Sequence, residues 1–172
     1  DGSPERSETS VVYLGGSYVL ALSREGAASG NVAFRQYLSS NNGSSWTDIG
    51  SVTFDSWSYS QATPPWLQRF RNVDGKLKIV CYYLHRSVGR LYAIYADAAD
   101  LIASGVSAWD SANKVEIASG FALGGSGYPS VIHYQDSPRG VGWYYDEYVS
   151  DQYTKITTLI SPYTLPLSVG GS

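Results

Sequence analysis

Hydrophobic and polar residues alternate over short runs along most of the chain, and no long run shows the 3.6-residue apolar period of an amphipathic helix. In three regions two such runs are joined by turn residues, and these regions cover residues 8–25, 66–86 and 128–147. The first turn contains Gly15-Gly16 and the second contains Asp74-Gly75. Runs joined in this way are typical of β-hairpins, and the three hairpins begin about 60 residues apart.

Each hairpin is followed by at least one further apolar run. Third strands are expected at residues 31–40, 90–97 and 152–160, and fourth strands at residues 46–52 and 114–118. Residues 98–104 are expected to form one helical turn at most. Four-stranded antiparallel units in series are typical of β-propeller blades. We therefore predict an all-β fold with about three blades, over residues 8–60, 61–122 and 123–165, in one partial propeller domain that spans residues 1–172. A β-sandwich of about ten to twelve strands is the alternative.

Composition excludes several classes of function. The chain has 172 residues, of which 43% are hydrophobic, as expected of a folded protein, and only 16% are charged, below the usual share of about 25%. A net charge of −3 without a lysine or arginine cluster argues against nucleic acid as a partner, and no apolar run is long enough to span a membrane. Cys81 is the only cysteine and lies in an apolar run, so we expect it to be buried. A single cysteine cannot form a disulfide within the chain, and one cysteine with two histidines is too few for a typical metal centre. We therefore expect no disulfide, no metal centre and no cofactor.

One motif stands between the third and fourth expected strands of the first repeat. Every second position of the motif is a small or polar residue: Ser39, Asn41, Gly43 and Ser45. Trp46 follows Ser45 directly. The motif resembles the Asp-box (BNR repeat), Ser-x-Asp-x-Gly-x-Thr-Trp, of the sialidase (neuraminidase) superfamily. Short polar side chains can bond the local backbone N–H groups of such a loop, and glycine can take the positive-φ position. The resemblance implies a sialidase-like propeller, with the box away from the active site, packing its tryptophan on the blade.

The same resemblance extends to charged residues and one tyrosine. In sialidases, a strand that begins Glu-Pro-Ser-Val-Val is paired with a strand that ends on an arginine, and Glu8 and Arg24 match these two positions. The resemblance implies that Glu8 is the catalytic glutamate and Arg24 a member of the arginine triad. It places a further triad arginine at Arg86 or Arg90, with Arg90 marginally better placed. The segment around Tyr128 resembles the one that carries the family's nucleophilic tyrosine.

Acidic sugars explain why these residue types occur together. The planar guanidinium of arginine suits bidentate binding of a sugar carboxylate. A tyrosine has a pKa of about 10 and needs a base such as glutamate to act as a nucleophile. The resemblance therefore implies a glycoside hydrolase that acts on an acidic, sialic-acid-like glycan. The alternatives are that Glu8 is a solvated strand residue, that Arg24 pairs structurally with Glu8 or Glu25, and that Tyr128 only packs.

Two elements of the family pattern have no counterpart. The first arginine of the triad and the loop with the acid/base aspartate are missing, and three blades do not close a ring. We expect the remaining blades to come from the same precursor, or the ring to be completed by self-association, and the isolated chain to be inactive or weak. The chain also resembles bacteriophage tail-spike endosialidases, which implies an extracellular or virion-surface location. The alternative functions are a non-catalytic glycan-binding propeller and a structural Asp-box module.

Overall fold

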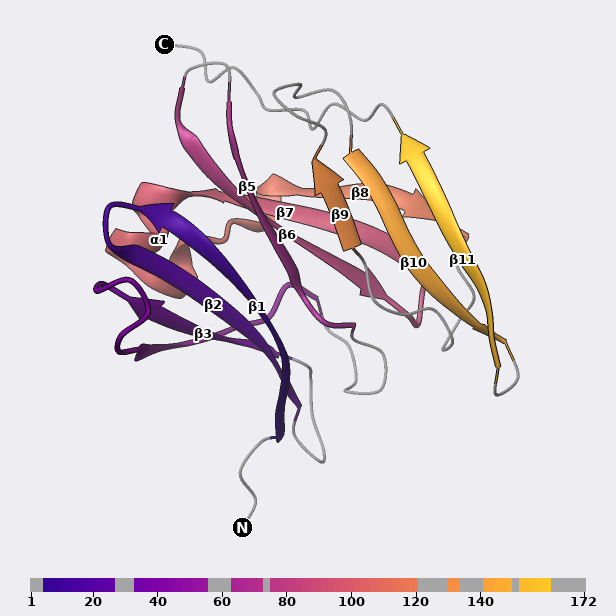
Figure 1. Ribbon diagram of the computed structural model, residues 1–172, viewed down its shortest axis with the longest axis horizontal. Helices are drawn as coiled ribbons and strands as arrows, with labels where there is room; N and C mark the ends of the chain where they lie inside the picture. Colours follow the sequence, from indigo (N-terminus) through magenta and orange to yellow (C-terminus); the bar gives the residue numbers. More distant parts are fainter. Residues whose placement is uncertain are drawn as a thin grey trace.

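The computed structural model describes residues 5–26, 33–55, 63–72, 75–120, 130–133, 141–149 and 152–161, and these form three antiparallel sheets (Figure 1). The first sheet contains β1 (Glu5–Gly15), β2 (Tyr18–Gly26), β3 (Ala33–Ser39) and β4 (Thr47–Val52). The second contains β5 (Trp66–Arg71), β6 (Leu77–His85), β7 (Arg90–Asp97) and β8 (Lys114–Ser119). The third contains β9 (Ser130–His133), β10 (Val141–Val149) and β11 (Gln152–Ser161).

The predicted all-β fold is confirmed, and the first two sheets are four-stranded and antiparallel. Strands that follow one another in the chain are neighbours in each sheet, as expected for consecutive hairpins. The first hairpin turns at Gly15 and Gly16, which both have positive φ angles. The described sheets do not close into a ring, so the propeller arrangement stays a prediction.

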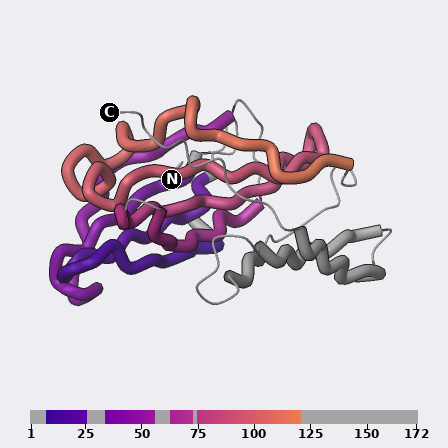
Figure 2. Tube along the Cα trace, turned by 90° about the horizontal axis from the view of Figure 1, so that it is seen from above, coloured from indigo at the N-terminus to yellow at the C-terminus, as the bar shows by residue number. Residues whose placement is uncertain are grey.

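One face of the first sheet packs against one face of the second, and Figure 2 shows the two sheets as separate layers. Leu20 and Leu22 of β2 and Phe34 of β3 are fully buried there, together with Ile79 and Tyr83 of β6. Alternate residues of a strand point to opposite faces, so this apolar set fixes which residues of each strand face outward. Burial of each of these side chains contributes about 1.5–3 kcal/mol.

The second sheet is apolar on both of its faces. Val80, Tyr82 and Leu84 alternate along β6 with the residues that face the first sheet, and they are buried in a second apolar cluster. Cys81 is buried on the face that packs against the first sheet, as the sequence predicted, and burial raises the pKa of its thiol. This second sheet therefore has the composition of an internal layer.

The first strands of the two sheets lie side by side. The backbone N–H of Leu67 in β5 donates to Ser10 Oγ in β1 over 2.9 Å. Nearby, the guanidinium of Arg69 lies over the ring of Tyr13 at 5.4 Å from its centroid. These contacts join the edges of the two sheets at β1 and β5.

Between β7 and β8 the chain is helical, in a longer segment than the sequence predicted. The α1 helix (Ala98–Ser104) has seven residues, about two turns, and two 3₁₀ turns follow at η2 (Gly105–Ala108) and η3 (Ser111–Asn113). The single turn expected here was too short, because Ala98 and Leu101 lie on one helical face and are buried in the core. Trp109 then donates from Nε1 to Oε1 of buried Gln36 over 3.1 Å, which holds this segment against β3.

No helix in the described part of the chain is long and apolar enough to cross a bilayer.

The Asp-box loop is held by side-chain hydrogen bonds within the loop. Ser39 Oγ accepts from the N–H of Gly43 over 2.9 Å and donates to Asn41 Oδ1 over 2.9 Å. Asn41 Oδ1 also accepts from the N–H of Ser45 over 2.9 Å, and its Nδ2 donates to Ser45 Oγ over 2.8 Å. Gly43 has φ +86°, and a Cβ on it would lie 3.7 Å from the Trp46 ring. Trp46 nevertheless remains 42% exposed, more than expected of a ring packed on the sheet.

Asn41 provides a test of this loop. We expect Asn41→Ala to lower the free energy of unfolding by about 1–2 kcal/mol, because the N–H of Ser45 and the hydroxyl of Ser39 lose their shared acceptor. Asn41→Asp keeps the acceptor and should stay within about 0.5 kcal/mol of the parent, since Ser45 can rotate its hydroxyl to donate. Urea unfolding measures both. Equal losses in the two variants would show that the Oδ1 acceptor is not what holds the loop.

Candidate functional site

Glu8 interrupts the pairing of β1 with β2. Ser7 lies opposite Arg24 and Thr9 lies opposite Ser23, so Glu8 is an extra residue that forms a β-bulge. Its φ is +54°, in the left-handed region that non-glycine residues rarely occupy. In an L-residue this conformation costs about 1–2 kcal/mol.

The bulge places the Glu8 carboxylate against Arg24. Oε2 of Glu8 lies 2.6 Å from Nε of Arg24, and both atoms are shielded from solvent. The side chains are 23% and 13% exposed, respectively, so the pair is only partly open to water. Arg24 lies opposite Phe34 in the register of β2 and β3, close to the end of the apolar interface between the sheets. The two residues that the sequence singled out as base and clamp are therefore in direct contact.

The other predicted site residues are placed differently. Arg90 begins β7 and donates from Nη1 to Oε2 of Glu116 on β8 over 2.9 Å. A hydrogen bond with Tyr92 and the charge of Glu116 raise the pKa of Arg90. Arg86 lies in the turn between β6 and β7. Arg24 and Arg90 thus each pair with a glutamate of their own sheet. Tyr128 lies outside the described residues.

A second polar cluster, which sequence reasoning missed, lies where the chain leaves β4. Asp55 Oδ1 lies 2.6 Å from Lys114 Nζ, and Asp55 Oδ2 accepts from the hydroxyl of Tyr83 over 2.8 Å. The ammonium of Lys114 lies over the ring of Tyr92, 5.0 Å from its centroid. Asp55 and Lys114 are far apart in the sequence, so no local spacing could reveal the pair. The contacts connect the end of the first sheet to the face of the second.

Burial determines the protonation of this cluster. It raises the pKa of Tyr83, and the charge of Asp55 raises it further, so the phenol stays protonated and donates to that carboxylate. Burial also lowers the pKa of His85, against an opposing effect of Asp55 and with a smaller lowering by Lys114. His85 Nδ1 lies 2.8 Å from Ser87 Oγ. His85 is buried.

Among the described residues, no group of three or more histidine, cysteine, aspartate or glutamate side chains is arranged to hold a metal ion.

Comparisons with known proteins do not assign the chain to a family. No family model matches it, and no curated protein matches it significantly. The sialidase resemblance therefore depends on the motifs of this sequence.

Glycine substitutions test the strain at Glu8. We expect Glu8→Gly to be about 1 kcal/mol more stable than Glu8→Ala, because both variants lose the ion pair with Arg24 and only glycine relieves the left-handed backbone. Thr9→Gly is the matched control. It should cost about 1–2 kcal/mol, because Thr9 has ordinary strand geometry and donates to Ser23 Oγ over 3.0 Å. Equal costs for Glu8→Gly and Glu8→Ala in chemical denaturation would contradict a strained Glu8.

The lowered pKa of His85 predicts a loss of stability in acid. Unfolded histidine binds a proton near pH 6.5, whereas buried His85 binds it only at lower pH. The unfolded state therefore takes up protons first, so the free energy of unfolding should fall as pH decreases below about 6.5. His85→Asn should show a smaller fall than the parent between about pH 7.5 and about pH 5.5 in urea unfolding. An unchanged pH dependence in this variant, with His133→Asn as control, would place the titrating group elsewhere.

Proposed function

We propose that the protein recognises an acidic glycan at the end of the first sheet that carries Glu8 and Arg24, as a sialidase-like glycoside hydrolase. The observation that carries the proposal is the 2.6 Å contact of Glu8 with Arg24 at a β-bulge where Glu8 is left-handed. Strained backbone conformations cluster at functional sites, and bulges are frequent beside active sites. Taking two charges partly out of water offsets much of their attraction, so the ion pair by itself is a weak reason for the strain.

The chemistry of the pair suits a sugar acid. The carboxylate of the sugar would compete with Glu8 for the planar guanidinium of Arg24, with Arg90 or Arg86 as the second arginine. Glu8 would then lie beside the bound sugar as a base. In the proposed reaction, the phenol proton of Tyr128 passes to Glu8, the phenolate oxygen bonds to the anomeric carbon as the glycosidic C–O bond breaks, and the leaving oxygen takes a proton from a water molecule. The hydroxide from that water then bonds to the anomeric carbon, the bond to the tyrosine oxygen breaks, and Glu8 returns the proton to the phenolate. Sialidases with a tyrosine nucleophile react in this manner.

A propeller arrangement is part of the proposal. Its support is the succession of four-stranded antiparallel sheets, the side-by-side first strands β1 and β5, and the internally bonded Asp-box loop. In such an arrangement the starts of the first strands lie at one end of a central axis, and Glu8 lies near the start of β1. We propose that further blades, from the same precursor or from other copies, continue this succession beyond the second sheet, whose other face is also apolar.

A second candidate is glycan binding without hydrolysis. The observation that favours it is the pairing of Arg24 with Glu8 and of Arg90 with Glu116, because an arginine already neutralised by a glutamate binds a ligand carboxylate less tightly. In this case Glu8 positions Arg24 and takes no proton.

Binding and turnover of a sialylated oligosaccharide by the full-length protein, which carries the further blades, separate the two candidates. Under the hydrolase proposal, Glu8→Gln should lower the rate of sialoside hydrolysis by about 10²–10⁴-fold, and Arg24→Ala should weaken binding by about 10-fold or more. Asp100→Asn on α1 and Arg71→Ala on β5 are matched controls, because both are exposed and lie away from the pair. Calorimetric titration and product analysis give the two readouts, and thermal unfolding checks the fold. Binding that depends on Arg24 without turnover supports the second candidate, and a sialoside that is neither bound nor cleaved sinks both.

A further inference from the structure

The outer face of the first sheet, which points away from the second sheet, has a polar surface with an ordered arrangement. Strand pairing puts two rows of residues across it, Val11, Ala21, Tyr37 and Asp48 in one row and Thr9, Ser23, Arg35 and Ser51 in the next. Val11 is 55% exposed and Tyr13, further along β1, is 40% exposed. The outer face therefore combines exposed apolar groups with polar groups held in register.

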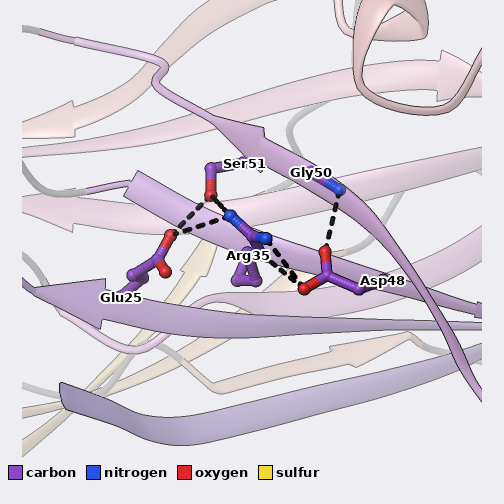
Figure 3. Close-up of polar contacts among 5 residues, drawn as sticks. All are labelled: Glu25, Arg35, Asp48, Gly50 and Ser51. Atoms are coloured by element: carbon purple, nitrogen blue, oxygen red, sulfur yellow. Dashed lines mark hydrogen bonds and ion pairs between the residues drawn. The ribbon is translucent and has the colours of Figure 1, made fainter. Parts of the chain in front are cut away.

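A network of hydrogen bonds fixes the polar groups in place (Figure 3). Arg35 donates from Nε to Asp48 Oδ2 over 2.9 Å and from Nη1 to Ser51 Oγ over 3.1 Å. Ser51 in turn donates to the carboxylate of Glu25, which is almost wholly buried. Asp48 Oδ1 accepts from the N–H of Gly50 over 3.0 Å. The orientations of the guanidinium and the carboxylate are thus set before any ligand arrives.

The same groups remain accessible to a ligand. The side chains of Arg35 and Asp48 are 30% and 37% exposed. Tyr37 lies opposite Asp48 in the register and two residues from Arg35 on β3, so its ring lies on the same face. Between them and β1, the second strand carries the small side chains of Ala21 and Ser23, which are themselves buried between their larger neighbours.

We propose that the outer face binds a neutral glycan chain through the Arg35–Asp48 pair and the rings of Tyr37 and Tyr13. A sugar hydroxyl both donates and accepts, so adjacent hydroxyls match a fixed pair of guanidinium donors and carboxylate acceptors. Aromatic side chains present an apolar surface together with a polar group, which suits the faces of sugar rings. The charges of Arg35 are already balanced by Asp48 and Glu25, so an ionic ligand gains little here.

A protein sheet is a poorer occupant of this face. Where the two sheets of this chain pack together, both faces are apolar, with Leu22, Phe34 and Tyr83 at the contact. Another sheet on the outer face would bury the Arg35–Asp48 pair, and taking both charges out of water costs several kcal/mol per ion before their attraction is counted. A glycan leaves the pair partly hydrated.

This site is independent of the one proposed at Glu8 and Arg24, and paired variants distinguish the two. The whole chain is titrated by calorimetry with neutral oligosaccharides of about six units, such as cellohexaose, maltohexaose and xylohexaose, and with a sialylated oligosaccharide. We expect at least one neutral oligosaccharide to bind with a dissociation constant below about 5 mM. Arg35→Lys should weaken that binding about 10-fold, because lysine lacks the planar fork. Tyr37→Ala and Tyr13→Ala should each weaken it about 3- to 10-fold.

The controls decide what a loss of binding means. Arg24→Ala should leave neutral-glycan binding unchanged, and Val88→Ala should do the same, since Val88 is an exposed apolar residue in the turn between β6 and β7. Arg35→Lys and Tyr13→Ala alter exposed groups, so they keep the test valid if Tyr37→Ala fails to fold. No binding by any neutral probe at about 5 mM, or binding unaffected by Arg35→Lys and Tyr13→Ala, would overturn the proposal. A dimer in sedimentation that Val11→Asp dissociates would also overturn it, because a second copy would then occupy the face.

Discussion

The apolar interface between the first two sheets is the constraint on which the other features depend. Leu22 and Phe34 are fully buried against Tyr83 and its neighbours, so every second residue of β2 and β3 must face inward. The residues between them, Ser23 and Arg35 among them, then face outward. A slip of one residue in either strand would put these polar groups into the core, which makes the register costly to change. The outer-face network is therefore a consequence of core packing.

Glu8 is the place where this alternation breaks. The extra residue in β1 lets the pairing with β2 continue on both sides, at the expense of a left-handed backbone at a glutamate. Asn42 has a similar φ in the Asp-box loop, but asparagine tolerates this conformation and lies in a turn that needs it. Glu8 lies within a strand and has no such local reason. Its carboxylate reaches Arg24, and this contact is what the bulge achieves.

The sequence was informative wherever the determinant was local. Alternation, the Gly15-Gly16 turn and the apolar run around Cys81 predicted the strands, the first hairpin and the burial of the thiol. The length of α1 was underestimated, because the helix depends on burial of Leu101 against other strands. Side-chain contacts that depend on the register of two strands could not be predicted from the sequence either. The contact of Arg90 with Glu116 depends on how β8 aligns with β7, and that of Asp55 with Lys114 joins two sheets. The bulge belongs to this class, since one sequence pattern fits a regular or a bulged strand.

The two faces of the first sheet differ in polarity, and this difference limits how further sheets can pack on it. In a closed propeller each sheet packs on a neighbour on both sides, as the two apolar faces of the second sheet would allow. The outer face of the first sheet instead carries Arg35 and two carboxylates, Asp48 and Glu25, which both form ion pairs with it. A neighbouring sheet would have to match that network with its own polar groups or leave the charges without water. Ring closure across this face and glycan binding on it therefore exclude each other. If the first sheet is the last one of a stack of sheets, its outer face and its end with Glu8 and Arg24 are both accessible. A glycan can then reach either of the two proposed sites.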